Sequence, residues 1–188
     1  MPGRFAAVSL ILLVFIVVAR VLWLRSKGVR AMSFGKTDRS DFLIPPFAAL
    51  YLYLVFAAAF GWPTVSRQIF FRSKILGWIG VLFCLAGLVM LLWSLISFGK
   101  SFRVGIDNEH PDQLVTTGIF AVSRNPIYVG FATVLVGQFL VFPNWILLVY
   151  LLAAAWLFHR QVLREEAFLK AHYGRDYAEY CGRVGRYL

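Results

Sequence analysis

Two stretches of the chain, residues 99–126 and 159–188, hold nearly all the side chains that could do chemistry. They contain every histidine and all but two of the nine acidic residues. Between them runs an apolar stretch, residues 127–158, which is interrupted near Pro143. A hairpin of two helices there would return both polar stretches to one side of the molecule. Polar groups that converge beside apolar surface are typical of a binding or catalytic site.

The first polar stretch ends in Arg124-Asn125-Pro126, which allows two interpretations. Asparagine is a favoured helix N-cap and proline a favoured first helical residue, so the motif predicts that a helix begins here. Arg124 would then lie at the membrane interface beside lipid phosphates. In the other interpretation, Arg124 and the positive end of that helix together bind a carboxylate or phosphate ligand.

The second polar stretch contains an adjacent acidic pair, Glu165 and Glu166. Glu166 stands four residues before Lys170, which is the spacing of an ordinary ion pair on a helix surface. Glu165 has an apolar residue at that spacing and has Gln161 one turn before it. We therefore expect Glu165, rather than Glu166, to face a polar cavity.

The elements that must position these residues are membrane helices. Of the 188 residues, 60% are apolar and 15% are charged, a composition typical of membrane proteins. Since a span needs about 20 apolar residues, residues 5–24, 42–62 and 75–98 are predicted spans. The stretch 127–158 adds a hairpin whose arms, about 15 residues each, are short for a full crossing. The sequence therefore predicts an all-α, polytopic bundle of about five transmembrane helices, forming one membrane domain over residues 1–188.

An amphipathic C-terminal tail follows the hairpin. Its first helix is predicted to end at Gly174, and residues 176–180 predict a short amphipathic helix with tyrosine anchors. Fourteen of the nineteen Lys and Arg residues fall in segment 25–41 and in the two polar stretches. The positive-inside rule therefore predicts an N-terminus outside, with the tail and both polar stretches in the cytoplasm.

Several functional classes are excluded by the motifs that the sequence lacks. It has no Gly-x-Gly-x-x-Gly or Walker loop and no His-Glu-x-x-His zinc motif. Cys84 and Cys181 provide neither a disulfide framework nor metal-ligand spacing, so no metal is expected. The chain has a net charge of +10, and its charged residues lie between the apolar runs. This arrangement favours contact with anionic membrane lipids over nucleic-acid binding.

Each polar stretch also carries an ordered motif. The first reads Leu114-Val-Thr-Thr-Gly-Ile-Phe120 and then Arg124-Asn-Pro-Ile-Tyr-Val-Gly130. The second reads Glu165-Glu-Ala-Phe-Leu169, then Tyr173-Gly174 and Tyr177-Ala-Glu-Tyr180. Together these motifs, over about residues 95–188, resemble the isoprenylcysteine carboxyl methyltransferase and phospholipid methyltransferase family of integral membrane enzymes.

The resemblance implies methyl transfer from S-adenosylmethionine, with residues 1–98 forming the first three helices and residues 99–188 the cofactor-binding and catalytic region. It implies membrane lipids and a lipophilic or lipidated acceptor as partners. Glu165 and Arg124 would be catalytic, and Arg160 or Arg164 would meet an anionic group of the substrate. The cofactor contacts that it implies are Gln113, Leu114, Val115, Phe120, Arg124, Asn125, Tyr128 and Glu165.

The chain departs from the family pattern within these motifs. Asn125 replaces the usual histidine, Phe120 replaces the usual tyrosine, and Gln161 stands where relatives often have arginine. Two other functions remain as alternatives: an NADPH-dependent enzyme like the sterol reductases, and a non-catalytic membrane scaffold. Reductases usually carry an acidic residue at the position of Phe131. The methyl acceptor stays open among carboxylates, amines and thiols.

Overall fold

The structure is a computed structural model that describes residues 2–26, 44–62, 70–71, 73–98 and 114–188. Its described residues form helices and short connections, with no strand among them. Three helices, over Pro2–Trp23, Lys74–Phe98 and Trp145–Arg183, are long and apolar enough to cross a membrane, which confirms the predicted all-α membrane bundle. In chain order the elements are α1 (Pro2–Ser26), α2 (Ile44–Phe60), α3 (Lys74–Phe98), the 3-10 turn η3 (Gly118–Ala121), α4 (Pro126–Val141) and α5 (Trp145–Arg183).

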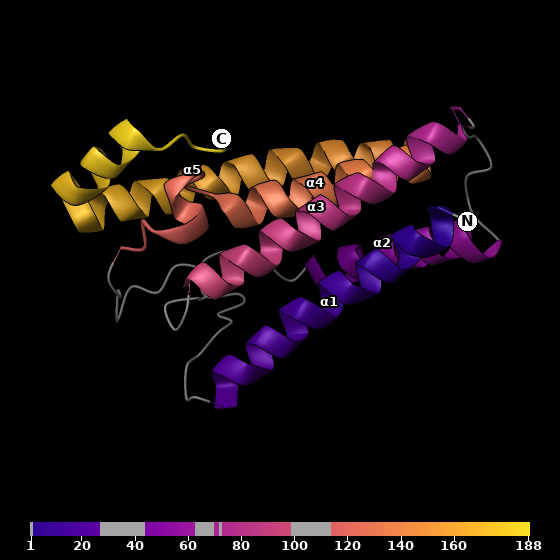
Figure 1. Ribbon diagram of the computed structural model, residues 1–188, viewed down its shortest axis with the longest axis horizontal. Coiled ribbons are helices and arrows are strands. Elements are labelled where there is room, and N and C mark those ends of the chain that lie inside the picture. The colour runs from indigo at the N-terminus through magenta and orange to yellow at the C-terminus, as the bar shows by residue number, and fades with distance from the viewer. Residues whose placement is uncertain (1, 27–43, 63–69, 72, 99–113) are drawn as a thin grey trace.

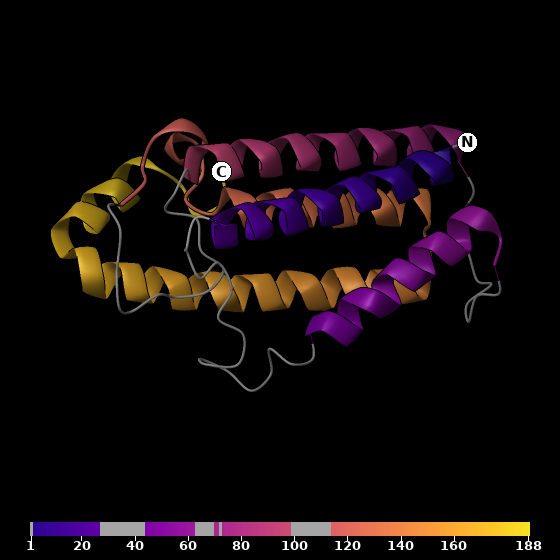
Figure 2. The same ribbon diagram turned by 90° about the horizontal axis from the view of Figure 1, so that it is seen from below.

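Helix α4 lies at the centre of the bundle, in contact with α1, α3 and α5 (Figure 1). Figure 2 shows α3 and α5 running along opposite sides of the molecule, with α2 inclined to both. The N-terminal end of α4 lies near the C-terminal end of α3 and the folded-back end of α5. This end of the bundle is where the predicted site residues gather.

Helices α3 and α4 pack closely because glycines, which have no side chain, lie where the two backbones meet. A Cβ atom on Gly87 would lie 2.7 Å from the carbonyl oxygen of Gly130, and one on Gly80 would lie 2.6 Å from that of Gly137. Small residues allow such backbone approach in membrane bundles. Gly130 is one turn into α4, so this contact fixes the start of α4, and with it the site, against α3.

A buried amide ties the middle of α4 to α1. Gln138 is fully buried, and its Nε2 donates to the Ala6 carbonyl at 2.7 Å and to the Ser9 hydroxyl at 3.1 Å. Interhelical hydrogen bonds of this kind stabilise contacts in membrane proteins, because lipid offers no competing partner. This contact was not predicted from the sequence.

The predicted hairpin is confirmed. Helix α4 ends at Val141, and Asn144 begins α5 by accepting a hydrogen bond from the Leu147 amide at 3.0 Å. The Asn144 side chain also donates to the Phe142 carbonyl at 3.0 Å, which closes the turn. Both polar stretches of the sequence therefore return to one end of the molecule.

Helix α5 continues far beyond its apolar part and then changes direction. Gly174 has φ +50° and ψ −113°, values outside the helical region, so the helix is kinked there, as the sequence predicts. Beyond the kink the chain is again helical as far as Arg183, and this part folds back (Figure 1). Segment 184–188 then reaches the start of α4, where the Gly185 carbonyl accepts from the Arg124 amide at 3.0 Å.

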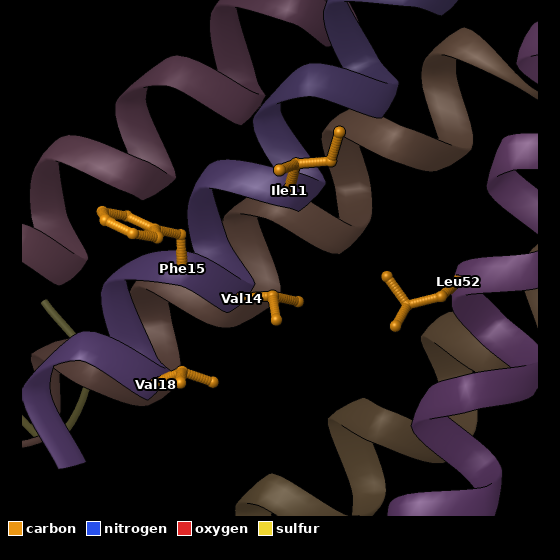
Figure 3. Close-up of a pocket in the computed structure, with 5 residues that line it drawn as sticks. All are labelled: Ile11, Val14, Phe15, Val18 and Leu52. Atoms are coloured by element: carbon orange, nitrogen blue, oxygen red, sulfur yellow. The ribbon is translucent and has the colours of Figure 1, made fainter. Parts of the chain in front are cut away.

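An apolar groove of about 370 Å³ lies between α1 and α2. Figure 3 shows Leu52 of α2 facing α1 across it. Every residue that lines it is apolar, as expected for a surface exposed to hydrocarbon. The lining residues are Ile11, Val14, Phe15, Val18 and Leu52.

Candidate active site

The candidate site forms where η3, the start of α4, the polar part of α5 and segment 184–188 meet. The structure brings four predicted residues together here: Arg124, Asn125, Tyr128 and Glu165. Gln113 lies outside the described residues. Two neighbouring sets of contacts make up the site, one around each member of the acidic pair.

The first set of contacts surrounds Glu165. The Tyr128 hydroxyl donates to Glu165 Oε1 at 2.6 Å, and Gln161 Nε2 donates to the same oxygen at 2.9 Å. Both donors are neutral, and among the described residues no cation forms an ion pair with this half-buried carboxylate. Glu165 is therefore a carboxylate that is held in place by neutral donors and has no cationic partner among the described residues. That Glu165 faces a polar cavity stays a prediction; the partners that the structure gives it, Tyr128 and Gln161, are both polar.

The second set of contacts surrounds Glu166, and it corrects the sequence interpretation. Glu166 does not lie on the surface paired with Lys170; it is 8% exposed and points inward. Its Oε2 accepts from Arg186 Nε at 2.9 Å, and its Oε1 accepts from Asn125 Nδ2 at 3.1 Å. The helical spacing to Lys170 was misleading because α4 and segment 184–188 cover this face of α5 with stronger partners.

Asn125 occupies the predicted N-cap position, followed by Pro126 at the first position of α4. Its side chain, however, makes no capping hydrogen bond. The amide donates instead to Glu166 and to the Arg186 carbonyl, both at 3.1 Å. The expectation that Asn125 simply caps the helix is therefore wrong, because the side chain links α4 to α5 and to segment 184–188.

Arg124 belongs to the same set of contacts; its side chain is 13% exposed and poorly paired. Its Nη2 lies 3.6 Å from Glu166 Oε1, and its Nη1 donates to Sγ of Cys181. Its Nε is buried and has no hydrogen-bond partner among the described residues. Since Glu166 is shared with Arg186, two guanidinium groups face one carboxylate, and the set carries a net positive charge. A buried donor without a partner is costly, which indicates that an acceptor completes this site.

The remaining predicted residues have different surroundings. Phe120 is 4% exposed and packs edge-on against Phe98, with ring centroids 4.6 Å apart. Its carbonyl accepts from the Tyr180 hydroxyl at 2.6 Å, which ties η3 to the folded-back part of α5. The two residues Leu114 and Val115 are half-buried beside η3, whereas Arg160 and Arg164 are exposed on α5.

Two further residues near the site, Tyr187 and Arg186, were not predicted from the sequence. Segment 184–188 is anchored by Tyr187, whose hydroxyl lies 2.7 Å from His159 Nδ1. Burial raises the pKa of the Tyr187 hydroxyl above its ordinary value, so this group stays protonated near neutral pH. Arg186, the strongest partner of Glu166, had no signal in the sequence beyond its charge.

Comparison with known proteins identifies the family. The family model for phospholipid methyltransferases matches residues 75–176, more than half of the chain. The chain belongs to the phospholipid methyltransferase family. The match runs from α3 through most of α5 and includes Arg124, Tyr128 and both glutamates, but it stops short of segment 184–188.

Several curated proteins similar to this phospholipid methyltransferase family member are named protein-S-isoprenylcysteine O-methyltransferase. The Xenopus laevis protein is 31% identical over 127 residues, which cover 64% of this chain and 44% of the relative. Form B from Arabidopsis thaliana is 32% identical over 56% of this chain and 55% of the relative, and the Saccharomyces cerevisiae protein is 30% identical over 60% and 48%. The chain thus matches about half the length of these relatives. No solved structure matches it significantly.

Proposed function

We propose that this protein is a membrane methyltransferase that uses S-adenosylmethionine as donor and a lipophilic, isoprenylcysteine-type molecule as acceptor. One observation supports this most: a poorly paired cation, Arg124, and a carboxylate without a cationic partner among the described residues, Glu165, lie on neighbouring parts of one partly buried site. S-adenosylmethionine carries a carboxylate, an ammonium and a sulfonium. Its charges are therefore complementary to those of the site.

The residues present fit such a donor. The buried Nε of Arg124 lacks an acceptor, and the donor's carboxylate would provide one. Glu165 would meet the ammonium or stabilise the positive charge at sulfur. The apolar and aromatic contacts with adenine are assigned to Leu114, Val115, Phe120 and Tyr128, together with Gln113 outside the described residues.

When bound, the donor supplies an electrophilic methyl group. The residues of the chain then have to align the acceptor and exclude water, an effect worth as much as about 7–11 kcal/mol in well-oriented reactions. A carboxylate or thiolate acceptor needs no base, whereas an amine must lose a proton. Glu165 is the candidate base in that case, since its second oxygen makes no hydrogen bond with the described residues.

The acceptor class rests on the relatives and on the surroundings of the site. Relatives are named for O-methylation of protein S-isoprenylcysteine, and the bundle around the site is apolar. Arg160 and Arg164 are assigned to an anionic group of the acceptor. The cytoplasmic position of the site remains a prediction from the charge distribution.

A thermal-shift experiment on detergent-purified protein tests the donor. S-adenosylmethionine and S-adenosylhomocysteine should raise the melting temperature, because a ligand at 100 times its Kd stabilises by about 2.7 kcal/mol. NADPH should have no effect. Radiolabelled methyl transfer to S-farnesylcysteine, with phosphatidylethanolamine as the alternative acceptor, then tests the substrate. Absence of stabilisation by either adenosyl ligand would refute the proposal.

A further inference from the structure

We infer that Arg186 is a positioning residue that holds Glu166 away from Arg124 and thereby keeps Arg124 available for an anionic ligand. This inference rests on the proposed function only in naming that ligand as the carboxylate of the methyl donor. Arg186 itself lies beyond the part of the chain that the family model matches.

The contacts of Glu166 are unequal. Arg186 Nε makes a direct hydrogen bond to it at 2.9 Å, whereas the nearest nitrogen of Arg124 is 3.6 Å away, beyond hydrogen-bonding range. Asn125 occupies the oxygen that is nearer to Arg124. Glu166 therefore pairs mainly with Arg186, and it only partly neutralises the charge of Arg124.

Removal of the Arg186 charge should change this balance. Glu166 is buried, and a buried carboxylate without a cation is strongly disfavoured. With Arg186 gone, Arg124 is the cation that remains in contact, so Glu166 should close the 3.6 Å gap and neutralise it. An anionic ligand would then have to displace Glu166 before it could bind.

The backbone holds Arg186 in place independently of its guanidinium group. The Arg186 carbonyl accepts from Asn125, and the neighbouring Gly185 carbonyl accepts from the Arg124 amide. The chain turns tightly here, since a Cβ atom on Gly185 would lie 2.3 Å from the Leu188 carbonyl oxygen. A side-chain substitution at Arg186 therefore keeps both backbone hydrogen bonds, and segment 184–188 should remain docked.

The test compares Arg186→Gln, Arg186→Lys and the double variant Arg186→Gln/Glu166→Gln with the unmodified protein. The first is expected to raise the Kd for S-adenosylmethionine roughly fivefold or more in calorimetry, a typical size for coupling between sites. The same variant should raise KM for the donor with little change in kcat. The lysine variant keeps the charge and should bind nearly as well as the unmodified protein. The double variant frees Arg124 again and should restore binding.

A second readout needs no donor. Labelling of arginine by phenylglyoxal, quantified at Arg124 by peptide mass spectrometry, should slow in Arg186→Gln and recover in the double variant. The matched control is Arg175→Gln/Glu179→Gln, which removes an ion pair of the same 2.9 Å length on the exposed face of α5 and should change neither readout.

The two readouts separate the two proposals. Unchanged labelling and binding in Arg186→Gln, or no recovery in the double variant, would overturn the role of Arg186. If the unmodified protein binds no S-adenosylmethionine but labelling falls and recovers as expected, the proposed donor is wrong and the role of Arg186 stands.

Discussion

Glu165 and Glu166 are neighbours in the chain, yet they lie in opposite electrostatic surroundings. Consecutive residues of a helix point about 100° apart. One carboxylate therefore meets Tyr128 and Gln161, which are neutral, and the other meets two arginines. The same side chain on the same helix can therefore be hydrogen-bonded by neutral donors or paired with arginines, according to the partners that other elements bring.

The largest expected effect is on activity at the uncompensated carboxylate. Glu165→Gln keeps the shape of the side chain but removes the carboxylate that is proposed to face the ammonium or the sulfonium of the donor. Methyl transfer should therefore fall roughly 100-fold or more, as is typical when a preorganised electrostatic partner is lost. Melting temperature should change little, because no ion pair is lost among the described residues. The measurement is the rate of radiolabelled methyl transfer, with Glu179→Gln on the exposed face as control. An active Glu165→Gln enzyme would show that the two carboxylates do not differ in function.

The next effect is on stability, and it is expected at the other carboxylate. Glu166→Leu leaves Arg124, whose side chain is 13% exposed, and Arg186, which is 39% exposed, without this counter-charge. Loss of one partner of a buried pair costs about 3–5 kcal/mol, and because solvent screens Arg186 the loss here should be smaller, about 1–3 kcal/mol. Glu165→Leu, the matched change one residue earlier, should cost clearly less. Thermal unfolding in the same detergent compares the two. Equal losses would contradict the electrostatic difference.

A smaller effect tests how Glu165 is held. Tyr128→Phe removes the 2.6 Å hydrogen bond and keeps the ring, so activity should fall roughly tenfold, as expected for one hydrogen bond to a charged group. Gln161→Leu removes the 2.9 Å bond and should have a similar effect. Activity assays of the two single variants and their combination measure this. If neither variant loses activity, Glu165 needs no fixed orientation.

The smallest effect is expected at Lys170, the partner that helical spacing suggested for Glu166. Because Lys170 is exposed and Glu166 is bound to Arg186, Lys170→Gln should change stability by less than about 0.5 kcal/mol. Its melting curve should overlay that of the unmodified protein. A loss comparable to that of Glu166→Leu would restore the interpretation drawn from spacing alone.

Much of the fold could be predicted because membrane helices are encoded locally. Apolar runs of sufficient length predicted α1, α2 and α3, and the interruption near Pro143 predicted the turn between α4 and α5. Gly174 predicted the kink, since glycine adopts positive φ readily. The hairpin also allowed the sequence to place Arg124 and Glu165 at the same end of the molecule.

What the sequence determined by itself was therefore the set of helices, their ends and the pair of polar stretches that meet. Only the tertiary structure decided which side chains pair where the two polar stretches meet. The Asn125 side chain binds Glu166 and the Arg186 carbonyl and makes no capping hydrogen bond. Glu166 binds Arg186 rather than Lys170, the partner that helical spacing suggested. The physical reason is that helix ends and spans follow from neighbouring residues, whereas a buried charge takes the partners available in three dimensions. Here Asn125 binds Glu166 and Arg186, which lie 41 and 61 residues away in the chain.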